Sequence, residues 1–333
     1  MPAAAAAAVA LAVVLDRLFA EPPARLHPVV WLGKIVGAVD RRFRSSALAG
    51  LLAAAVLPLA FAGAAAGTVW GGAVLVAAVV SGTSAVPVLP AFSALPAATA
   101  VAGLLAGLVL FSCSSLRMLL DAASEVVSLS VSDLDAARNA LPSLAGRDPS
   151  ALSAADVRST AVESAAENLA DGLVAPLAAF AFAAAGASLL GASTPFLALP
   201  LAAGATAWVK GVNTLDSMLG YRSKPVGRAP ARLDDAVMWL PARASALCLG
   251  LAVRSPGAVV RAREWARIPA SPNSGWPMAT AAAALDVRLR KPDAYDLNPD
   301  RELPDAETAA AGVRLVGRAG WTAVAIAGVT AAV

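Results

Sequence analysis

Two long stretches of the chain contain no charged residue: 72 residues from Ser45 to Leu116 and 38 residues from Gly172 to Val209. A helix needs about 20 apolar residues to cross the hydrocarbon core of a bilayer. The first stretch can therefore hold two crossings, or three short ones broken near Pro58 and Pro87–Pro90. The second fits a two-helix hairpin that turns near Ser193–Pro195. With 58% hydrophobic residues, 15% charged residues and a mean hydropathy of +0.69, the chain is too apolar for ordinary soluble domains.

These features predict an all-α, polytopic helical membrane protein with about five to seven membrane segments. A further crossing is expected from about Gly312 to the end, and the first fifteen residues form either a brief span or an interfacial helix. The stretch 236–253 is short and contains Pro241 and Arg243, which are costly inside a membrane helix. It is therefore expected to be re-entrant or interfacial.

Charged residues gather in four polar segments, 16–46, 117–168, 210–235 and 254–307. Lys and Arg outnumber the acids six to three in the first segment and five to three in the third, which favours the cytoplasmic side for both. If 236–253 does not cross the membrane, all four segments form one cytoplasm-facing surface of helices and loops. The chain is then a single membrane domain over residues 1–333.

The third polar segment directly follows a charge-free stretch, and ten residues that carry a charge, an amide or a phenol lie within its 26 positions. Such groups are costly beside a membrane unless they pair or bind something. Asn213, Thr214 and Asp216 offer oxygens suited to Mg²⁺. Donors suited to phosphate or carboxylate come from Lys210, Arg222, Lys224 and Arg228. Alternatively the basic residues meet anionic lipids, which would explain the cations but not the amide and the carboxylate.

Two other features of the polar segments allow two interpretations each. Arg232, Asp234 and Asp235 form either a locally satisfied ion-pair cluster or a pair of adjacent acids that hold a metal or a ligand amine. His27, the only histidine, cannot build a multi-histidine metal site, and it fits a structural role as well as a functional one.

Glu163, Glu167 and Asp171 recur every four residues, so they form one acidic stripe on a predicted helix, with Asn168 beside it. Thr160 and Glu163 have capping-box spacing, which predicts that this helix starts at Thr160. Like charges on one helix face are destabilising unless a cation or donor meets them. Glu167 and Asp171 are therefore expected to bind Mg²⁺ or a basic partner. The alternative assigns Glu163 to the capping box and leaves the other two in solvent.

The segment Ser271–Pro277 reads Ser-Pro-Asn-Ser-Gly-Trp-Pro, with two prolines bracketing small polar residues. This composition disfavours a regular helix. It predicts a rigid binding loop that presents Asn273 and Ser274, with Trp276 as a flat apolar surface. A plain turn between helices is the alternative.

Standard sequence motifs for phosphate-binding loops, zinc proteases, dithiol sites and serine hydrolases are absent from the chain. A nucleotide would therefore need a nonstandard site. The basic residues are not interleaved with aromatic residues, so a nucleic acid is not expected as a partner.

Six segments, in the same order along the chain, resemble the CobD/CbiB family of membrane proteins, the adenosylcobinamide-phosphate synthases of cobamide biosynthesis. They are His27–Gly33, Gly146–Asp148, Ala161–Leu177, Lys210–Arg222, Ala231–Arg243 and Ser271–Pro277. The sequence departs from the family at Leu169-Ala170, where small hydroxyl residues are usual, and at Glu21, where Asp is usual. The first departure puts in doubt a role for a hydroxyl at 169–170.

The resemblance implies an enzyme that joins the free propionate carboxyl of adenosylcobyric acid to (R)-1-aminopropan-2-ol or its O-phosphate. The product is adenosylcobinamide or its phosphate. Because amide formation from a carboxylate needs activation, the resemblance also implies ATP and Mg²⁺, with an acyl phosphate favoured over an acyl adenylate. The implied setting is the cytoplasmic membrane, with a multi-pass chain, lipid contacts and a cytoplasmic active face. Other proteins of the cobalamin pathway are possible partners.

Within this scheme the residues above take two kinds of role. The catalytic groups are predicted to be Lys210, Asn213, Asp216, Asp234 and Asp235, and the three aspartates would also hold Mg²⁺. The substrate-binding groups are predicted to be His27, Glu167, Asn168, Asp171, Tyr221, Arg222, Arg232, Asn273, Ser274 and Trp276. The competing hypotheses are a non-catalytic corrinoid-binding scaffold and a transporter. A transporter predicts ionisable residues within its spans, and the two longest apolar runs contain none.

Overall fold

The computed structural model describes residues 1–82, 95–192, 194–220 and 224–333, and its regular structure is almost entirely helical. Contacts within the chain divide it into two compact units. The first unit comprises Met1–Ser114, Ala175–Val237 and Val324–Val333, and the second comprises Ser115–Val174 and Met238–Ala323. The single domain with one shared polar face stays a prediction. The predicted break at Pro87–Pro90 and residue Ser193 of the predicted turn lie outside the described residues.

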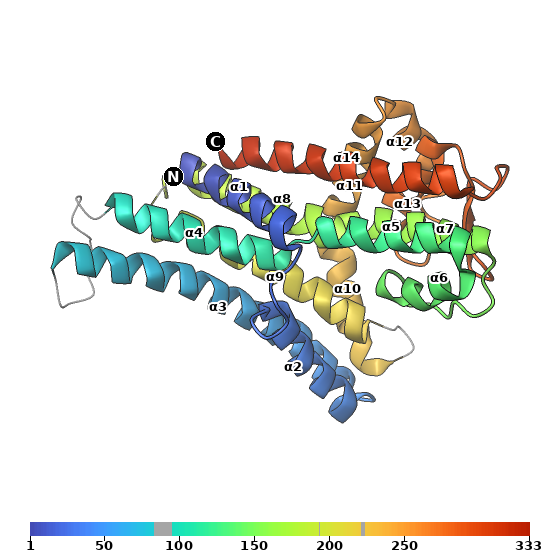
Figure 1. The fold of residues 1–333 in the computed structure, drawn as a ribbon. Coiled ribbons are helices and arrows are strands. Elements are labelled where there is room, and N and C mark those ends of the chain that lie inside the picture. The colour runs from blue at the N-terminus through green and yellow to red at the C-terminus, as the bar shows by residue number, and fades with distance from the viewer. Residues whose placement is uncertain (83–94, 193, 221–223) are drawn as a thin grey trace. The chain divides into compact units, whose positions relative to one another are not determined.

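Long helices that lie side by side form the first unit (Figure 1). They are α1 (Pro2–Phe19), α3 (Ala47–Ser81), α4 (Leu95–Cys113), α8 (Ala175–Leu189) and α9 (Ala198–Leu219). α3 packs along α9 and α4, α1 along α4, and α8 along α9. Three shorter elements, α2 (Pro28–Phe43), η4 (Pro225–Gly227) and α10 (Arg228–Val237), contact both α3 and α9. The small residues of these helices let their backbones approach closely, as is common between membrane helices.

Four helices are long and apolar enough to cross a membrane: Pro2–Phe19, Ala47–Ser81, Leu95–Ser132 and Ala154–Leu189. On α3, Leu48, Leu52, Val56 and Leu59 are all more than half exposed and recur at helical spacing, as expected of a face that contacts lipid. These observations confirm the predicted class, a helical membrane protein. The count of five to seven segments stays a prediction, because α9 and α14 (Ala306–Ala331) carry charged residues within their length.

Gly50 lies at a close contact between α3 and η4. A Cβ atom at this position would collide with the backbone carbonyl of Val226, and backbone cannot rotate aside as a side chain can. Gly50→Ala is therefore expected to lower the free energy of unfolding by about 1–3 kcal/mol. Gly63→Ala in the same helix is the matched control, because a Cβ there meets nothing within 4 Å. Equal thermal unfolding of the two variants in detergent would contradict the close packing at residue 50.

Shorter helices and one β-hairpin form the second unit. The helices that lie mainly within it are α5 (Arg117–Ser132), α6 (Leu134–Ala140), η2 (Leu141–Ser143), α7 (Ala154–Leu169), the π-helix η3 (Ala170–Val174), α11 (Trp239–Ala252), α12 (Pro256–Ala262), α13 (Gly275–Leu285) and most of α14. β1 (Leu289–Lys291) pairs antiparallel with β2 (Tyr295–Leu297). α7 packs against α5, α13 and β1, so it is the element around which the unit's core forms. Buried apolar residues from these elements are Val126, Val157, Val162, Leu169, Met278 and Leu289.

The acidic-stripe helix begins earlier than the sequence predicted. α7 starts at Ala154, and Ser153 and Asp156 form its capping box. Thr160 lies inside the helix and is fully buried, so the predicted start at Thr160 is wrong. Both pairs have the same hydroxyl-to-acid spacing, and the residues between them are compatible with a helix, so spacing could not choose between them.

The start of α13 corrects a second expectation. Ser271–Ser274 are irregular, as predicted, but Gly275, Trp276 and Pro277 form the first turn of α13. Proline is tolerated there because the first N–H groups of a helix have no acceptor within the helix. The neighbouring α11 has 14 residues, fewer than the roughly 20 needed to cross a bilayer. Its re-entrant or interfacial placement stays a prediction that this length favours.

Candidate functional site

The polar face predicted for residues 210–220 forms the C-terminal half of α9 in the first unit. Asn213 is only 7% exposed, and Lys210 and Asp216 are half-buried one turn to either side of it. The Thr214 hydroxyl donates to the Lys210 carbonyl at 2.7 Å. A Cβ on Gly220 would collide with the Asp216 carboxylate, so this glycine leaves room for the carboxylate beside the helix end. Tyr221 and Arg222, which follow in sequence, lie outside the described residues.

α10 brings a second set of charges close to α9. Arg232 and Asp235 line a depression of about 440 Å³ together with Arg228 and Ala231. Asp234 lies beside Asp235 on the same helix. This short element thus carries two basic and two acidic side chains on its length of ten residues, which suits a ligand bearing both an anionic group and a transferable proton.

Lys224, one of the predicted phosphate donors, already forms an ion pair within the protein. Lys224 Nζ lies 3.4 Å from Asp40 Oδ2 on α2. This ion pair fastens η4 to α2, so Lys224 already has a carboxylate partner. Its predicted role as a phosphate donor would require that pair to open.

His27 precedes α2 and is buried, with 6% of its surface exposed. Its Nε2 lies 3.5 Å from Glu21 Oε2, and its Nδ1 is buried without a hydrogen bond to any described residue. The side chain therefore links the preceding turn to the helix start. Its role in substrate binding stays a prediction.

One cavity of the first unit is lined almost entirely by apolar side chains. It holds about 550 Å³ between α2, α3, α4 and α9, and no charged side chain lines it. Its two hydroxyl residues, Thr68 and Ser112, each donate to a carbonyl four residues earlier in their own helix. This cavity is therefore not a candidate reaction site.

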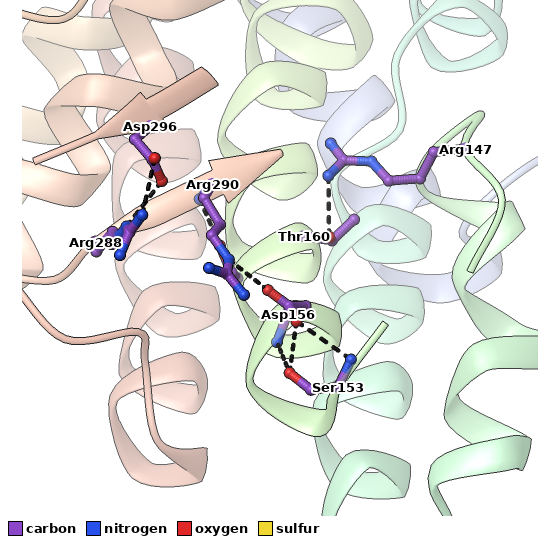
Figure 2. A network of polar contacts seen from close by, with 8 residues as sticks. Arg147, Ser153, Asp156, Thr160, Arg288, Arg290 and Asp296 are labelled. Carbon is purple, nitrogen blue, oxygen red and sulfur yellow. Dashed lines mark hydrogen bonds and ion pairs between the residues drawn. The ribbon is translucent and has the colours of Figure 1, made fainter. Parts of the chain in front are cut away.

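In the second unit, Glu163 and Arg147 form a buried ion pair. Arg147 Nη2 lies 2.5 Å from Glu163 Oε1, and the two side chains are 12% and 0% exposed. Arg147 Nη1 also donates to the Thr160 hydroxyl at 3.1 Å (Figure 2). Tyr295 donates its hydroxyl to the same Glu163 oxygen at 2.5 Å. Burial, reinforced by the Glu163 carboxylate, raises the pKa of Tyr295, so the hydroxyl remains a donor. Glu163 thus has no part in a helix cap, contrary to one of the sequence interpretations.

The β-hairpin is fastened to the start of α7 by polar contacts. Arg290 Nε lies 2.7 Å from Asp156 Oδ1 (Figure 2). The Arg290 backbone N–H donates to the Ser159 hydroxyl at 2.9 Å. Arg288 makes two 2.8 Å bonds to Asp296, which lower the pKa of that carboxyl. The two contacts of Arg290 fix the position of the hairpin on α7, and the bonds between Arg288 and Asp296 hold the hairpin together.

The register of the hairpin places Lys291 directly opposite Tyr295. Directly opposed residues project from the same side of a two-stranded sheet. Because Tyr295 reaches Glu163, Lys291 projects toward α7 as well. It lies within electrostatic range of Glu167, one turn beyond Glu163.

The predicted acidic stripe follows α7 into η3. Glu167 is repelled by Asp171 and Glu163 and attracted by Arg147 and Lys291. The amide of Asn168 donates to two backbone carbonyls, those of Leu144 at 3.3 Å and Ser164 at 2.9 Å. The stripe ends in a π-helical turn, an irregularity that is frequent at functional sites. Glu167, Asn168 and Asp171 are thus brought together as predicted, while their binding role stays a prediction.

Arg243 organises the segment that precedes α13. Its Nη1 donates to Asn273 Oδ1 at 2.6 Å, and its Nη2 donates to the Pro272 carbonyl at 3.2 Å. Its guanidinium lies 4.6 Å from the ring centroid of Trp239 and 5.1 Å from that of Trp276. Asn273 is only 4% exposed, so it is not presented outward as expected, because Arg243 holds it inward. Ser274 and Trp276 remain half-exposed.

No three His, Cys, Asp or Glu side chains within the described ranges lie close enough to hold a metal ion together. Asp216, Asp234 and Asp235 thus do not form a three-carboxylate group there, and their predicted role in holding Mg²⁺ stays a prediction. Mg²⁺ commonly needs only one or two carboxylates when substrate phosphates supply further ligands. Asp216 with Asn213, one turn earlier on α9, fits that smaller requirement.

Three residues of these clusters, Arg147, Tyr295 and Arg243, were not among the predicted site residues. Arg147 and Arg243 stand inside matched family segments, so those segments carried a usable signal. Tyr295 is one of only two tyrosines in the chain. Its partner Glu163 is 132 positions away, and no local pattern connects the two.

Comparison with known proteins gives one consistent result. The model of the family described as "CobD/Cbib protein" matches residues 9–319. A probable cobalamin biosynthesis protein CobD from Methanothrix thermoacetophila is 32% identical over 318 residues, covering 93% of this chain and 91% of the relative. The cobalamin biosynthesis proteins CobD of Rhodobacter capsulatus and Klebsiella pneumoniae are 36% and 35% identical, covering 81% and 85% of this chain and 75% and 81% of theirs. No solved structure matches the chain significantly.

Proposed function

Because this chain belongs to the CobD/CbiB family, a family of cobalamin biosynthesis, we propose that it is a membrane-bound carbon–nitrogen ligase of that pathway. The proposed reaction joins the propionate carboxyl of adenosylcobyric acid to the nitrogen of (R)-1-aminopropan-2-ol or its O-phosphate. A C–N bond forms, the leaving carboxyl oxygen departs on a phosphate group taken from ATP, and the ammonium loses two of its three protons. The proposed location is the cytoplasmic membrane, with the reaction on the cytoplasmic side.

The observation that carries this proposal is the extent of the family match. It runs from residue 9 to residue 319, so it includes α9, α10, the acidic stripe and the Arg243 cluster. The family supplies the reaction class, and these clusters supply groups that such a reaction needs. Acidic and basic side chains lie within a few residues of each other both on α9 and α10 and around the acidic stripe.

On α9, the proposed role of Asp216 and Asn213 is to hold Mg²⁺ against nucleotide phosphates. ATP with Mg²⁺ would supply the activation that amide formation from a carboxylate requires. Lys210 and Arg222 are proposed to bind phosphate or carboxylate oxygens, since cations near a reacting anion stabilise charge that develops there.

On α10, Asp234 or Asp235 is proposed to accept the proton that the ammonium loses before its nitrogen attacks. A carboxylate placed within reach of such a proton typically contributes about 10²–10⁴-fold to a rate. Arg232, which lines the same depression as Asp235, is proposed to hold an anionic part of a substrate beside that base.

Reconstitution tests the proposed reaction directly. Detergent-purified protein is incubated with adenosylcobyric acid, ATP, Mg²⁺ and either the amino alcohol or its phosphate. Mass spectrometry is expected to detect the amide, and ADP or AMP in the same sample identifies how the carboxyl was activated. Corrinoid binding without amide, in a detergent where a control synthase works, would support the scaffold instead.

A further inference from the structure

One of the two carboxylate oxygens of Glu163 accepts no hydrogen bond from the described residues. The side chain is fully buried, and both Arg147 and Tyr295 bind Oε1. Oε2 is also buried and has no hydrogen-bond partner among the described residues. An unsatisfied buried acceptor is costly. A donor supplied by a ligand would therefore be stabilising at this point.

The spacing of the acidic stripe determines the size of ligand that suits it. Glu163, Glu167 and Asp171 lie on successive turns, and eight residues of helix span about 12 Å. Metal–oxygen bonds are only about 2.0–2.6 Å long, and no three such residues within the described ranges can hold a metal together. An organic ammonium, with three donors and a carbon chain behind it, suits carboxylates on adjacent turns better.

Lys291 adds a cation to the same cluster of side chains. Lys291 projects from the hairpin on the side of Tyr295 and attracts Glu167 electrostatically. Arg147 is already bonded to Glu163 and Thr160, whereas Lys291 belongs to none of the ion pairs found among the described residues. This partly buried cluster therefore offers carboxylates for a positive group and an ammonium for a negative one. A short ligand with both charges matches it.

We propose that Glu163, Glu167 and Lys291, together called the amine face, bind a short aminoalkyl phosphate. The ligand ammonium lies between Glu163 Oε2 and the Glu167 carboxylate, and its phosphate contacts Lys291. Arg147 and Tyr295 are positioning residues: they occupy Oε1 and leave Oε2 to the ligand. This inference rests on the proposed function, since it gives the amine substrate of that reaction a binding site in the second unit, from which the substrate leaves before its ammonium gives up a proton on α10.

Calorimetric titration of the full-length protein in detergent, without corrinoid or nucleotide, tests the amine face. The probes are 1-aminopropan-2-ol O-phosphate and the unphosphorylated amino alcohol. Glu167→Gln is expected to weaken both by about tenfold or more, because it removes a charge-assisted bond to the ammonium. Lys291→Met is expected to weaken only the phosphorylated probe. Glu125→Gln, which changes an exposed glutamate on α5, is the matched control with wild-type affinity.

The outcomes separate this inference from the proposed function. Wild-type affinities in Glu167→Gln and Lys291→Met would overturn the amine face, even if the same protein forms amide. If wild-type protein forms amide but binds neither probe alone, the KM for the amine becomes the readout. It must then rise about tenfold in Glu167→Gln, with the KM for ATP unchanged, or the inference is wrong. Absence of both binding and amide product would overturn the proposed function together with it.

Discussion

Arg147→Met is expected to lower the free energy of unfolding by about 3–5 kcal/mol. The substitution keeps much of the apolar length of the side chain but removes the cation that lies 2.5 Å from Glu163. Glu163 is fully buried, so its carboxylate would be left in the interior without a compensating charge. Breaking a buried ion pair by removing one partner typically costs about this much. Unfolding by SDS in mixed micelles, followed by circular dichroism, measures the change.

Two further variants make this expectation specific. Arg117→Met removes an arginine whose ion pair with Asp121 is exposed, and such pairs contribute about 0–1 kcal/mol. Arg147→Met combined with Glu163→Gln should recover part of the loss, because the buried charge is gone while an acceptor for Tyr295 remains. If Arg147→Met unfolds like Arg117→Met, Glu163 does not depend on Arg147 for its charge.

The class of the fold was predictable because it depends on local properties. The charge-free runs from Ser45 and Gly172 are visible in sequence, and helices are the usual way for such a chain to satisfy its backbone in lipid. The acidic stripe of Glu163, Glu167 and Asp171 was predictable for a similar reason, since helical periodicity determines which residues share a face. Neither prediction required knowledge of which helices pack together.

The partners of these residues were not predictable, because they depend on contacts distant in sequence. Glu163 meets Arg147, 16 positions away, and Tyr295, 132 positions away. Asn273 was expected to be presented outward, since no local pattern signals that Arg243, 30 positions earlier, holds it inward. The β-hairpin that carries Lys291 has strands of three residues each, too short for a recognisable alternation.

The three aspartates predicted to hold Mg²⁺ also show that sequence does not determine how side chains are arranged in space. Asp216, Asp234 and Asp235 are acids in one polar segment, so sequence alone suggested a common ligand. Their positions on two different helices, α9 and α10, do not form a three-carboxylate group. Proximity in sequence therefore identified the region but not the arrangement, and the metal role of the three aspartates stays a prediction.

Asp216→Asn is expected to reduce amide formation by about 10²-fold or more, the loss typical when a group that stabilises charge or moves a proton is removed. Asparagine has nearly the same size, so it fits the space that Gly220 leaves beside the end of α9, and folding should be preserved. Asp121→Asn, an exposed position on α5, is the matched control and should retain full activity. Wild-type turnover by correctly folded Asp216→Asn protein would remove this residue from the site.

The form of the loss in Asp216→Asn would identify what the carboxylate does. If Asp216 holds Mg²⁺, the variant should need more Mg²⁺ for half-maximal activity, and saturating Mg²⁺ should restore part of the rate, because nucleotide phosphates and Asn213 still supply ligands. If Asp216 instead accepts the proton of the ammonium, added Mg²⁺ should restore nothing. In that case raising the pH should help, because more of the amine is already deprotonated before it binds. Measuring the rate against Mg²⁺ and against pH in the same preparation separates the two roles.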